Sequence, residues 1–519
     1  MRQFALLTLL TLTSLVHANT VFSFLNEPGP YPVGLKVVQR YDYSRVYKWK
    51  VDMLTGQPAV GERARPIQAL IWYPAQKGGK KMIYKDYATT IATEENFSLN
   101  KVQVNEKLSA WLGNYVPGIT DEQVKKSVAQ EMWAVQDAKS VSGKFPLIVY
   151  APSLSSNAFE NVDLCEYLAS QGYVVISSAD MGSRTRGMTD DLEGIEAQVA
   201  DIEYLIGYAK QNIHEADTSH IAVIGYSWGG ISNVFAAAKD DRISAIVSLD
   251  GSVRYFPAIV SSAKYVTPAR VKIPFLFVAS KSRPIEDQLK YKADLTSSFL
   301  NDMKYSDVYK VIMHPMRHGD FASLFLRFEP LGDDTDYSID EISLAHSWVA
   351  RYVNHFLNAY LKNDSTSLTF LNNTPARNKV PAHMMSVDVH HSEGEPATLE
   401  NFVAAIGQRG FTHAEEIYEE MHKKDANFKL DANGLNSWGY ELMQGGRIKE
   451  SIAILSLVPV IYPESGNGYD SLAEAYEKNN EKEQAIKNYR RSLELDPKND
   501  NAVQHLKSLG APVAENFQK

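Results

Sequence analysis

Short apolar runs of strand length alternate with helical patterns from about residue 30 to residue 355, and this alternation restricts the fold most strongly. Parallel neighbouring strands need long crossover connections, usually helices. The pattern therefore predicts an α/β fold, in which a mostly parallel sheet is covered by helices on both faces. The expected strands cover residues 67–73, 145–150, 173–177, 221–224, 243–249, 274–278 and 309–313, with helices at about 158–171, 190–213 and 231–238.

One of these strand-to-helix turns carries the sequence Gly225-Tyr-Ser-Trp-Gly-Gly230. A serine in such a turn sits on strained backbone, and neighbouring glycines let the strand and the helix approach closely. The hydroxyl then projects above the sheet, where the helix N-terminus favours developing negative charge. Ser227 is therefore the predicted nucleophile, and the main-chain N–H of Trp228 is placed to serve an oxyanion hole.

A serine hydroxyl needs a base within hydrogen-bond reach and an acid that orients the base. In this type of fold the chain order is serine, acid, histidine. His314 and His318 both follow the strand at 309–313, and the longer loop reach favours His318. Asp250 and Asp287 each follow a later strand, and the spacing of the strands alone leaves the choice between these two acids open. The usual position of the acid, after the later strand, would favour Asp287.

The region from about residue 28 to residue 356 resembles the α/β-hydrolase superfamily, in the branch of platelet-activating-factor acetylhydrolases and dienelactone-hydrolase-like esterases. The matching segments are Gly29-Pro-Tyr-Pro-Val-Gly34, Asp42-Tyr-Ser-Arg45, Arg65-Pro-Ile-Gln-Ala-Leu-Ile-Trp-Tyr-Pro-Ala75, Tyr150-Ala-Pro-Ser-Leu-Ser155 and His318-Gly-Asp-Phe-Ala-Ser323.

This resemblance implies a site as well as a fold. In the acetylhydrolases the acid ends the strand that follows the nucleophile helix, and the matching residue here is Asp250. The second oxyanion donor of the family corresponds to the main-chain N–H of Leu154. The chain departs from the family in the same loop, because it has Pro152 and Ser153 where those proteins usually carry His-Gly.

Two further segments interrupt the alternation. Residues 77–142 are polar and mostly helical in pattern without a strand signal, so they predict a cap segment inserted into a hydrolase domain of residues 19–362. Residues 363–397 contain the turn-forming sequence Asn372-Asn-Thr-Pro375 and Pro381, and they predict a linker.

The region 398–510 shows helical patterns only, and the pattern repeats every 34 residues. Such helix pairs, in which a proline ends the second helix, resemble the tetratricopeptide repeat. The array could dock a protein partner or pack on the hydrolase domain, and the sequence favours neither. The residues that match at this spacing are Trp438 and Leu472, Ile452 and Ile486, and Pro463 and Pro497.

The N-terminus has the features of a secretory signal peptide. Arg2 supplies a positive charge, an uncharged apolar run follows, and small residues lead to predicted cleavage after Ala18. No later segment is long and apolar enough to span a bilayer. We therefore expect a secreted or periplasmic protein.

Composition excludes several classes of function. The chain has 519 residues and a formal net charge of −9, without the clustered Lys and Arg of a nucleic-acid binder. Its single cysteine, Cys165, excludes intramolecular disulfides and multi-cysteine metal sites. Neither a phosphate-cradling motif nor a dinucleotide fingerprint occurs, so we expect no cofactor and no metal.

The sequence thus predicts a serine hydrolase that cleaves short acyl or acetyl esters, a small-molecule substrate, through an acyl-enzyme. A lactonase or a peptidase of the same fold is the alternative within that class. A different class would be an interaction protein, in which the helical repeats bind a protein and the hydrolase domain is a degenerate scaffold.

Overall fold

The computed structural model describes residues 21–513, apart from 54, 115–118, 282–284, 291 and 330–334. The predicted signal peptide at 1–18 lies outside the described residues. The chain divides into two compact units, Met1–Glu393 and Gly394–Lys519. In the described residues no helix is long and apolar enough to cross a membrane.

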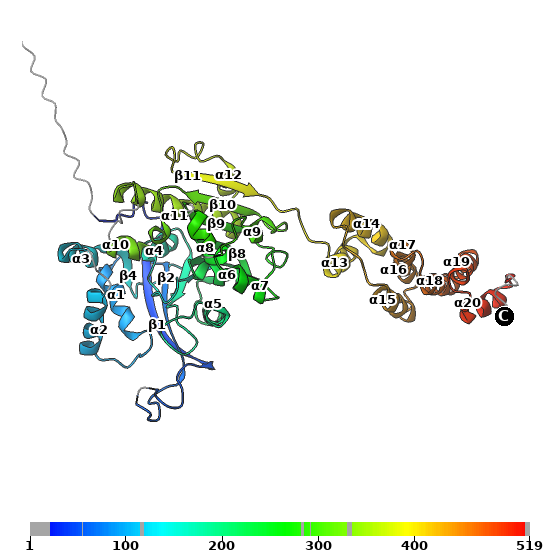
Figure 1. Ribbon diagram of the computed structural model, residues 1–519, viewed down its shortest axis with the longest axis horizontal. Helices are drawn as coiled ribbons and strands as arrows, with labels where there is room; N and C mark the ends of the chain where they lie inside the picture. The colour runs from blue at the N-terminus through cyan, green and yellow to red at the C-terminus, as the bar shows by residue number, and fades with distance from the viewer. Residues whose placement is uncertain are drawn as a thin grey trace, which may run out of the picture. The chain divides into compact units, whose positions relative to one another are not determined.

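The first unit is built on one sheet with helices packed around it (Figure 1). Its 11 described strands have the order β11-β10-β9-β8-β7-β5-β6-β2-β1-β4-β3. In the sheet, each pair of neighbouring strands from β10 across to β6 is parallel. This arrangement is the predicted α/β fold. The strand bounds are β1 Val33–Val46, β2 Ala64–Pro74, β3 Lys81–Ile83, β4 Glu131–Gln136, β5 Phe145–Ala151, β6 Val174–Ser178, β7 Ala216–Tyr226, β8 Ile243–Leu249, β9 Phe275–Ser280, β10 Val308–Met313 and β11 Met385–His390.

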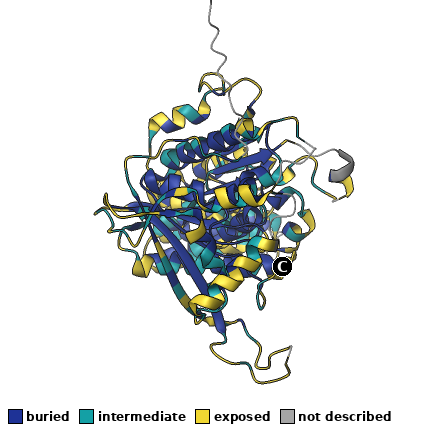
Figure 2. Cartoon of the chain, turned by 90° about the vertical axis from the view of Figure 1, so that its left-hand side faces the viewer, coloured by how far each residue is buried: buried dark blue, intermediate teal, exposed yellow. Residues whose placement is uncertain are grey.

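Helices cover both faces of this sheet, and the central strands are buried between them (Figure 2). Alternate residues of β5 show the division: Ile148 packs in the core with α4 (Val162–Ser170) and α11 (Ile339–Leu361), whereas Val149 packs with α5 (Leu192–Asn212) and α6 (Gly229–Lys239). Period-two alternation of buried side chains is what a strand with two covered faces requires.

Shorter helices complete the first unit, several of them in the loops that follow the parallel strands. They are α1 Tyr84–Ala88, η1 Thr89–Thr93, α2 Lys101–Asn114, α3 Asp121–Val128, η2 Ser252–Arg254, α7 Pro257–Ser262, α8 Ile285–Lys290, α9 Ser298–Asn301, η3 His318–Phe321, α10 Ser323–Phe328 and α12 Ser365–Asn372.

The segment 77–142 was expected to lack strands, and this prediction is wrong. It contains the helices α1, α2 and α3, but also β3 and β4, which form one edge of the sheet. The reason is that β4 is short and only Met132 and Ala134 are buried in it, so its alternation is too brief to stand out from a helical pattern.

The expected linker at 363–397 is also corrected by the structure. It contains α12 and the edge strand β11, which pairs antiparallel with β10 from Met385 to His390. An edge strand has one neighbour only, and the residues of β11 other than Met385 are half-buried or exposed, so its sequence resembles that of a polar linker. The boundary between the two compact units falls after Glu393.

The second unit contains helices and no strand among its described residues. The starts of α15 and α18 differ by 466 − 432 = 34 residues, and those of α16 and α19 by 482 − 448 = 34, as the sequence period predicts. Gly439 allows the helices of a pair to touch, because a Cβ there would lie 2.4 Å from Leu455. The helix bounds are α13 Leu399–Arg409, η4 Phe411–His413, α14 Ala414–Lys424, α15 Ala432–Gln444, α16 Ile448–Leu455, α17 Leu457–Ile461, α18 Gly466–Lys478, α19 Lys482–Leu495 and α20 Asp500–Ser508.

Candidate active site

Ser227 lies in a sharp turn between the end of β7 and the start of α6. Its φ is 53°, in the left-handed region that a residue with a side chain rarely adopts. The turn is held in place because the Ser227 N–H donates to the carbonyl of Leu249 at 3.0 Å, at the end of the neighbouring strand β8. Such local strain persists only where the surrounding structure enforces it.

Glycines on each side of the serine make this turn possible. A Cβ on Gly225 would lie 2.0 Å from the carbonyl oxygen of Gly229, across the turn. A Cβ on Gly229 would lie 2.0 Å from the carbonyl oxygen of Ala151, at the end of β5. The missing side chains therefore let the first turn of α6 contact the loop that follows β5, which carries Leu154.

A chain of hydrogen bonds joins Ser227 to a histidine and an acid. The Nε2 atom of His318 lies 2.9 Å from the Ser227 Oγ, and its Nδ1 lies 2.6 Å from an Asp250 carboxylate oxygen. Asp250 follows β8, and His318 begins η3 after β10. All three residues thus follow carboxyl ends of parallel strands, where ligands bind in open α/β sheets.

Asp250 is fixed from its other side by Ser280, at the end of β9. The main-chain N–H of Ser280 donates to one carboxylate oxygen at 2.9 Å, and its hydroxyl donates to the other at 3.0 Å. Burial alone would raise the pKa of Asp250, but the hydrogen bonds from His318 and Ser280 outweigh it and lower the pKa. The carboxylate beside the imidazole is therefore kept ionised.

The histidine is anchored through its main chain as well. The hydroxyl of Tyr226, which directly precedes the serine, donates to the carbonyl oxygen of His318 at 2.8 Å. A third of the His318 side chain remains exposed, so solvent reaches the imidazole. Sequence reasoning missed Tyr226 and Ser280 because nothing in their spacing shows which main-chain and carboxylate atoms they would reach.

The structure thus brings Ser227, His318 and Asp250 together. His314 lies apart from them, at the edge between β10 and β11, where its N–H donates to the carbonyl of Met384 at 3.0 Å. The alternative acid, Asp287, falls within α8, but its side chain lies outside the described residues.

The two predicted oxyanion donors lie in segments that contact each other, because Gly229 touches the end of β5. Trp228 begins the first turn of α6, and its indole is buried against Phe256. In the part of the chain that the structure describes, neither the main-chain N–H of Leu154 nor that of Trp228 donates to a protein acceptor. Both groups are free to bind a substrate oxygen.

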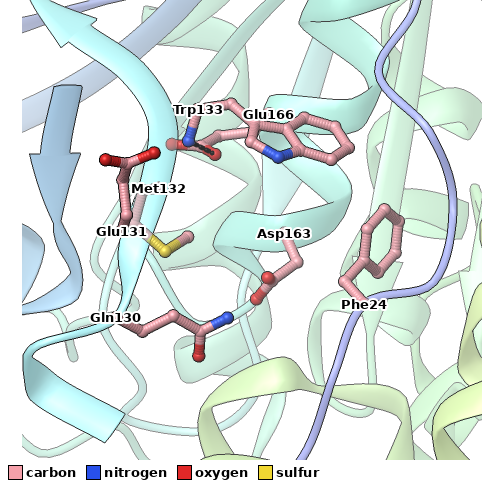
Figure 3. Close-up of a pocket in the computed structure, with 7 residues that line it drawn as sticks. All are labelled: Phe24, Gln130, Glu131, Met132, Trp133, Asp163 and Glu166. Carbon is pink, nitrogen blue, oxygen red and sulfur yellow. Dashed lines mark hydrogen bonds between the residues drawn. The ribbon is translucent and has the colours of Figure 1, made fainter. Parts of the chain in front are cut away.

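Other reactive groups of the first unit are engaged elsewhere. A small cavity of about 50 Å³ lies between β4 and α4, and none of Ser227, His318 and Asp250 lines it (Figure 3). Its carboxylates bind protein donors: Asp163 pairs with Arg327 at 2.5 Å, and Glu166 accepts the Trp133 N–H at 2.7 Å. Cys165 is buried, and burial raises the pKa of its thiol well above its ordinary value, which disfavours the reactive thiolate.

No group of three or more His, Cys, Asp or Glu side chains that could hold a metal ion occurs among the described residues. The site offers three side chains for chemistry: a hydroxyl, an imidazole that can accept its proton, and an acid that fixes the imidazole.

Two parts of the chain match models of known protein families. Residues 133–322, which include Ser227, Asp250 and His318, match the model of the dienelactone hydrolase family, and residues 466–499 match that of a tetratricopeptide repeat. Among solved structures, a ferulic acid esterase from Streptomyces cinnamoneus aligns with 70% of this chain and 98% of its own, at 17% identity and a TM-score of 0.48. No curated protein matches the chain significantly.

Proposed function

We propose that this chain, which carries a hydrolase domain of the dienelactone hydrolase family at residues 133–322, is a serine hydrolase of carboxylic esters. The observation that carries the proposal is the unbroken chain of hydrogen bonds from Asp250 through His318 to Ser227, at a strained strand-to-helix turn. A nucleophile, a base and an orienting acid in this order are the parts that acyl transfer requires.

The mechanism begins at the serine hydroxyl. His318 accepts the Ser227 proton at Nε2 while the Oγ attacks the ester carbonyl, and Asp250 stabilises the imidazolium through Nδ1–H. The N–H groups of Leu154 and Trp228 bind the oxygen of the tetrahedral intermediate. The imidazolium then gives its proton to the leaving alcohol, and an acyl-enzyme remains.

Water completes the cycle. His318 takes a proton from the water that attacks the acyl carbonyl. The bond between the acyl carbon and the Ser227 Oγ then breaks, the imidazolium gives its proton to that Oγ, and the carboxylic acid leaves. The exposed third of the His318 side chain supports this step, because water can reach the imidazole without any rearrangement of the described residues.

Short acyl or acetyl esters are the proposed substrates, and they follow from the resemblance of the N-terminal region to acetylhydrolases. A lactone is the second candidate, favoured by the match of residues 133–322 to the dienelactone hydrolase family. Rates on acetyl esters, longer acyl esters, lactones and aminoacyl amides would distinguish these classes and would also reveal a peptidase.

The test of the function itself is the variant Ser227→Ala. We expect this variant to hydrolyse 4-nitrophenyl acetate only slightly faster than the uncatalysed reaction, because the remaining rate enhancement comes from binding alone. Unchanged hydrolysis in a folded Ser227→Ala protein would refute the proposal.

Export and docking complete the proposed function. The protein would be secreted or periplasmic after cleavage behind Ala18, which N-terminal sequencing of the mature protein tests. The tetratricopeptide repeat at 466–499 supports a protein-binding role for the second unit. Removal of that unit should then leave ester hydrolysis unchanged.

A further inference from the structure

The loop that carries Leu154 is tied down by a buried glutamate outside the triad. One carboxylate oxygen of Glu160 accepts the main-chain N–H of Ser153 at 3.0 Å and the hydroxyl of Tyr150 at 3.1 Å. The other oxygen accepts the hydroxyl of Ser153. Glu160 is completely buried, and the donors to its carboxylate are two hydroxyls and a main-chain N–H. A buried carboxylate is costly unless donors satisfy it, and here neutral donors of one short segment do so.

The next peptide groups of the loop are held as firmly. The N–H of Ser155 donates to a carboxylate oxygen of Asp180 at 2.8 Å, and the N–H of Ser156 donates to the carbonyl of Ser153 at 2.9 Å. From Ser153 to Ser156, therefore, Leu154 alone keeps its main-chain N–H without a protein acceptor among the described residues.

Carbonyl groups of the loop are also taken, by side chains from other elements. Gln198 of α5 donates to the carbonyl of Pro152 at 2.8 Å. The guanidinium of Arg186 donates to the carbonyl oxygens of Ser155 at 3.1 Å and Ser156 at 3.2 Å. With its flanking peptides held on both sides, the Leu154 peptide has little freedom to rotate.

We propose that Glu160 is a positioning residue of the oxyanion hole, which holds the Ser153 peptide and hydroxyl so that the Leu154 N–H stays aimed at the substrate oxygen. The inference rests on the proposed function, because an aimed N–H contributes only if negative charge develops on a substrate carbonyl. Preorganised donors stabilise that charge without reorganising during the reaction, so a loosened loop should slow the chemical step.

The test compares Glu160→Gln with Glu166→Gln. Glu166 is a matched control because it is also buried, lies six residues further along, and accepts two main-chain N–H groups and a tyrosine hydroxyl. Its partners belong to β4 and α1, away from the loop of Leu154. Both variants lose one buried carboxylate, so a merely structural effect would be shared.

We expect kcat for 4-nitrophenyl acetate to fall about 10- to 100-fold in Glu160→Gln with KM changed by less than about threefold. Glu166→Gln should keep kcat within about threefold of the wild type per active site, counted by fluorophosphonate titration. Inhibition by a trifluoromethyl ketone, which binds serine as a tetrahedral oxyanion, should weaken in Glu160→Gln by the same factor as kcat.

A milder variant covers the case in which Glu160→Gln does not fold. Ser153→Ala removes one donor to Glu160 but keeps the main-chain N–H, and it should lower kcat and the trifluoromethyl ketone affinity together, by about 3- to 10-fold. The inference is wrong if Glu160→Gln, or Ser153→Ala in its place, matches Glu166→Gln in both kcat and affinity for the trifluoromethyl ketone. The proposed function fails separately, if Ser227→Ala still hydrolyses the ester.

Discussion

Replacement of Asp250 by asparagine should reverse the hydrogen bonding of the histidine. One carboxylate oxygen of Asp250 accepts a fixed main-chain N–H from Ser280, so the amide oxygen of an asparagine would take that place. The amide NH₂ would then face the Nδ1 of His318, which now lies 2.6 Å from the other oxygen. Nδ1 would have to accept, and the imidazole proton would move to Nε2, facing the Ser227 hydroxyl.

That tautomer cannot take the proton of the serine. In serine hydrolases with an orienting aspartate, the same change lowers kcat by about 10⁴-fold, equivalent to ~5 kcal/mol of transition-state stabilisation. The Asp250 site matches the conditions for a loss of this size, since the carboxylate is buried and both of its oxygens are held.

The assay measures kcat/KM for 4-nitrophenyl acetate, and the residual activity of Ser227→Ala gives the lower limit. Asp287→Asn serves as the control, because Asp287 is the other acid that the strand order allows, and we expect it to stay within about threefold of the wild type. The reasoning is refuted if Asp250→Asn retains a tenth or more of the wild-type activity, or if Asp287→Asn loses as much.

Two further predictions follow from packing and burial. Gly229→Ala should lower both the thermal midpoint and kcat, because its Cβ would press on Ala151 and displace the loop of Leu154, whereas Gly207→Ala in α5, where no atom lies within 4 Å, should do neither. Burial raises the pKa of Glu166 from 4.5 to about 7, so the folded state binds a proton more tightly than the unfolded state does. Stability should then fall as pH rises from 4.5 to about 7, and denaturant unfolding across this range should show a smaller fall in Glu166→Gln. An equal fall in stability in the wild type and in Glu166→Gln would contradict the prediction for Glu166.

The sequence predicts the α/β fold and both family resemblances, and the structure and the comparisons confirm them. These features are local: a strand, a glycine-flanked serine and a helix lie within about 20 residues, and helix pairs repeat at a constant spacing. Neither of these two features depends on residues that are far away in the sequence.

The histidine and the acid are harder to predict from the sequence, because their positions depend on how far loops reach. Asp250 and Asp287 both follow parallel strands, and the strand spacing cannot tell which carboxylate meets His318. The structure places Asp250 there because its backbone turns sharply, with a φ of 44°, directly after β8. The family resemblance had pointed to the same residue.

Edge strands and supporting side chains are the parts that the sequence did not reveal. β11 is an edge strand and β4 is the strand next to the opposite edge, and each has few buried residues, so their alternation is weak. Glu160 reads as an ordinary residue near a helix, since its partners are main-chain and hydroxyl groups of a loop whose course the sequence does not specify. Only the folded loop shows why a carboxylate is buried there.

The central claim is that Ser227 is the nucleophile, and the most direct test is to locate its covalent adduct. A fluorophosphonate should react with the intact protein once, and mass spectrometry of its peptides should find the phosphonyl group on Ser227, with Ser227→Ala remaining unlabelled. The account is contradicted if the active protein is labelled at another residue, or if it hydrolyses the ester at full rate after complete labelling of Ser227.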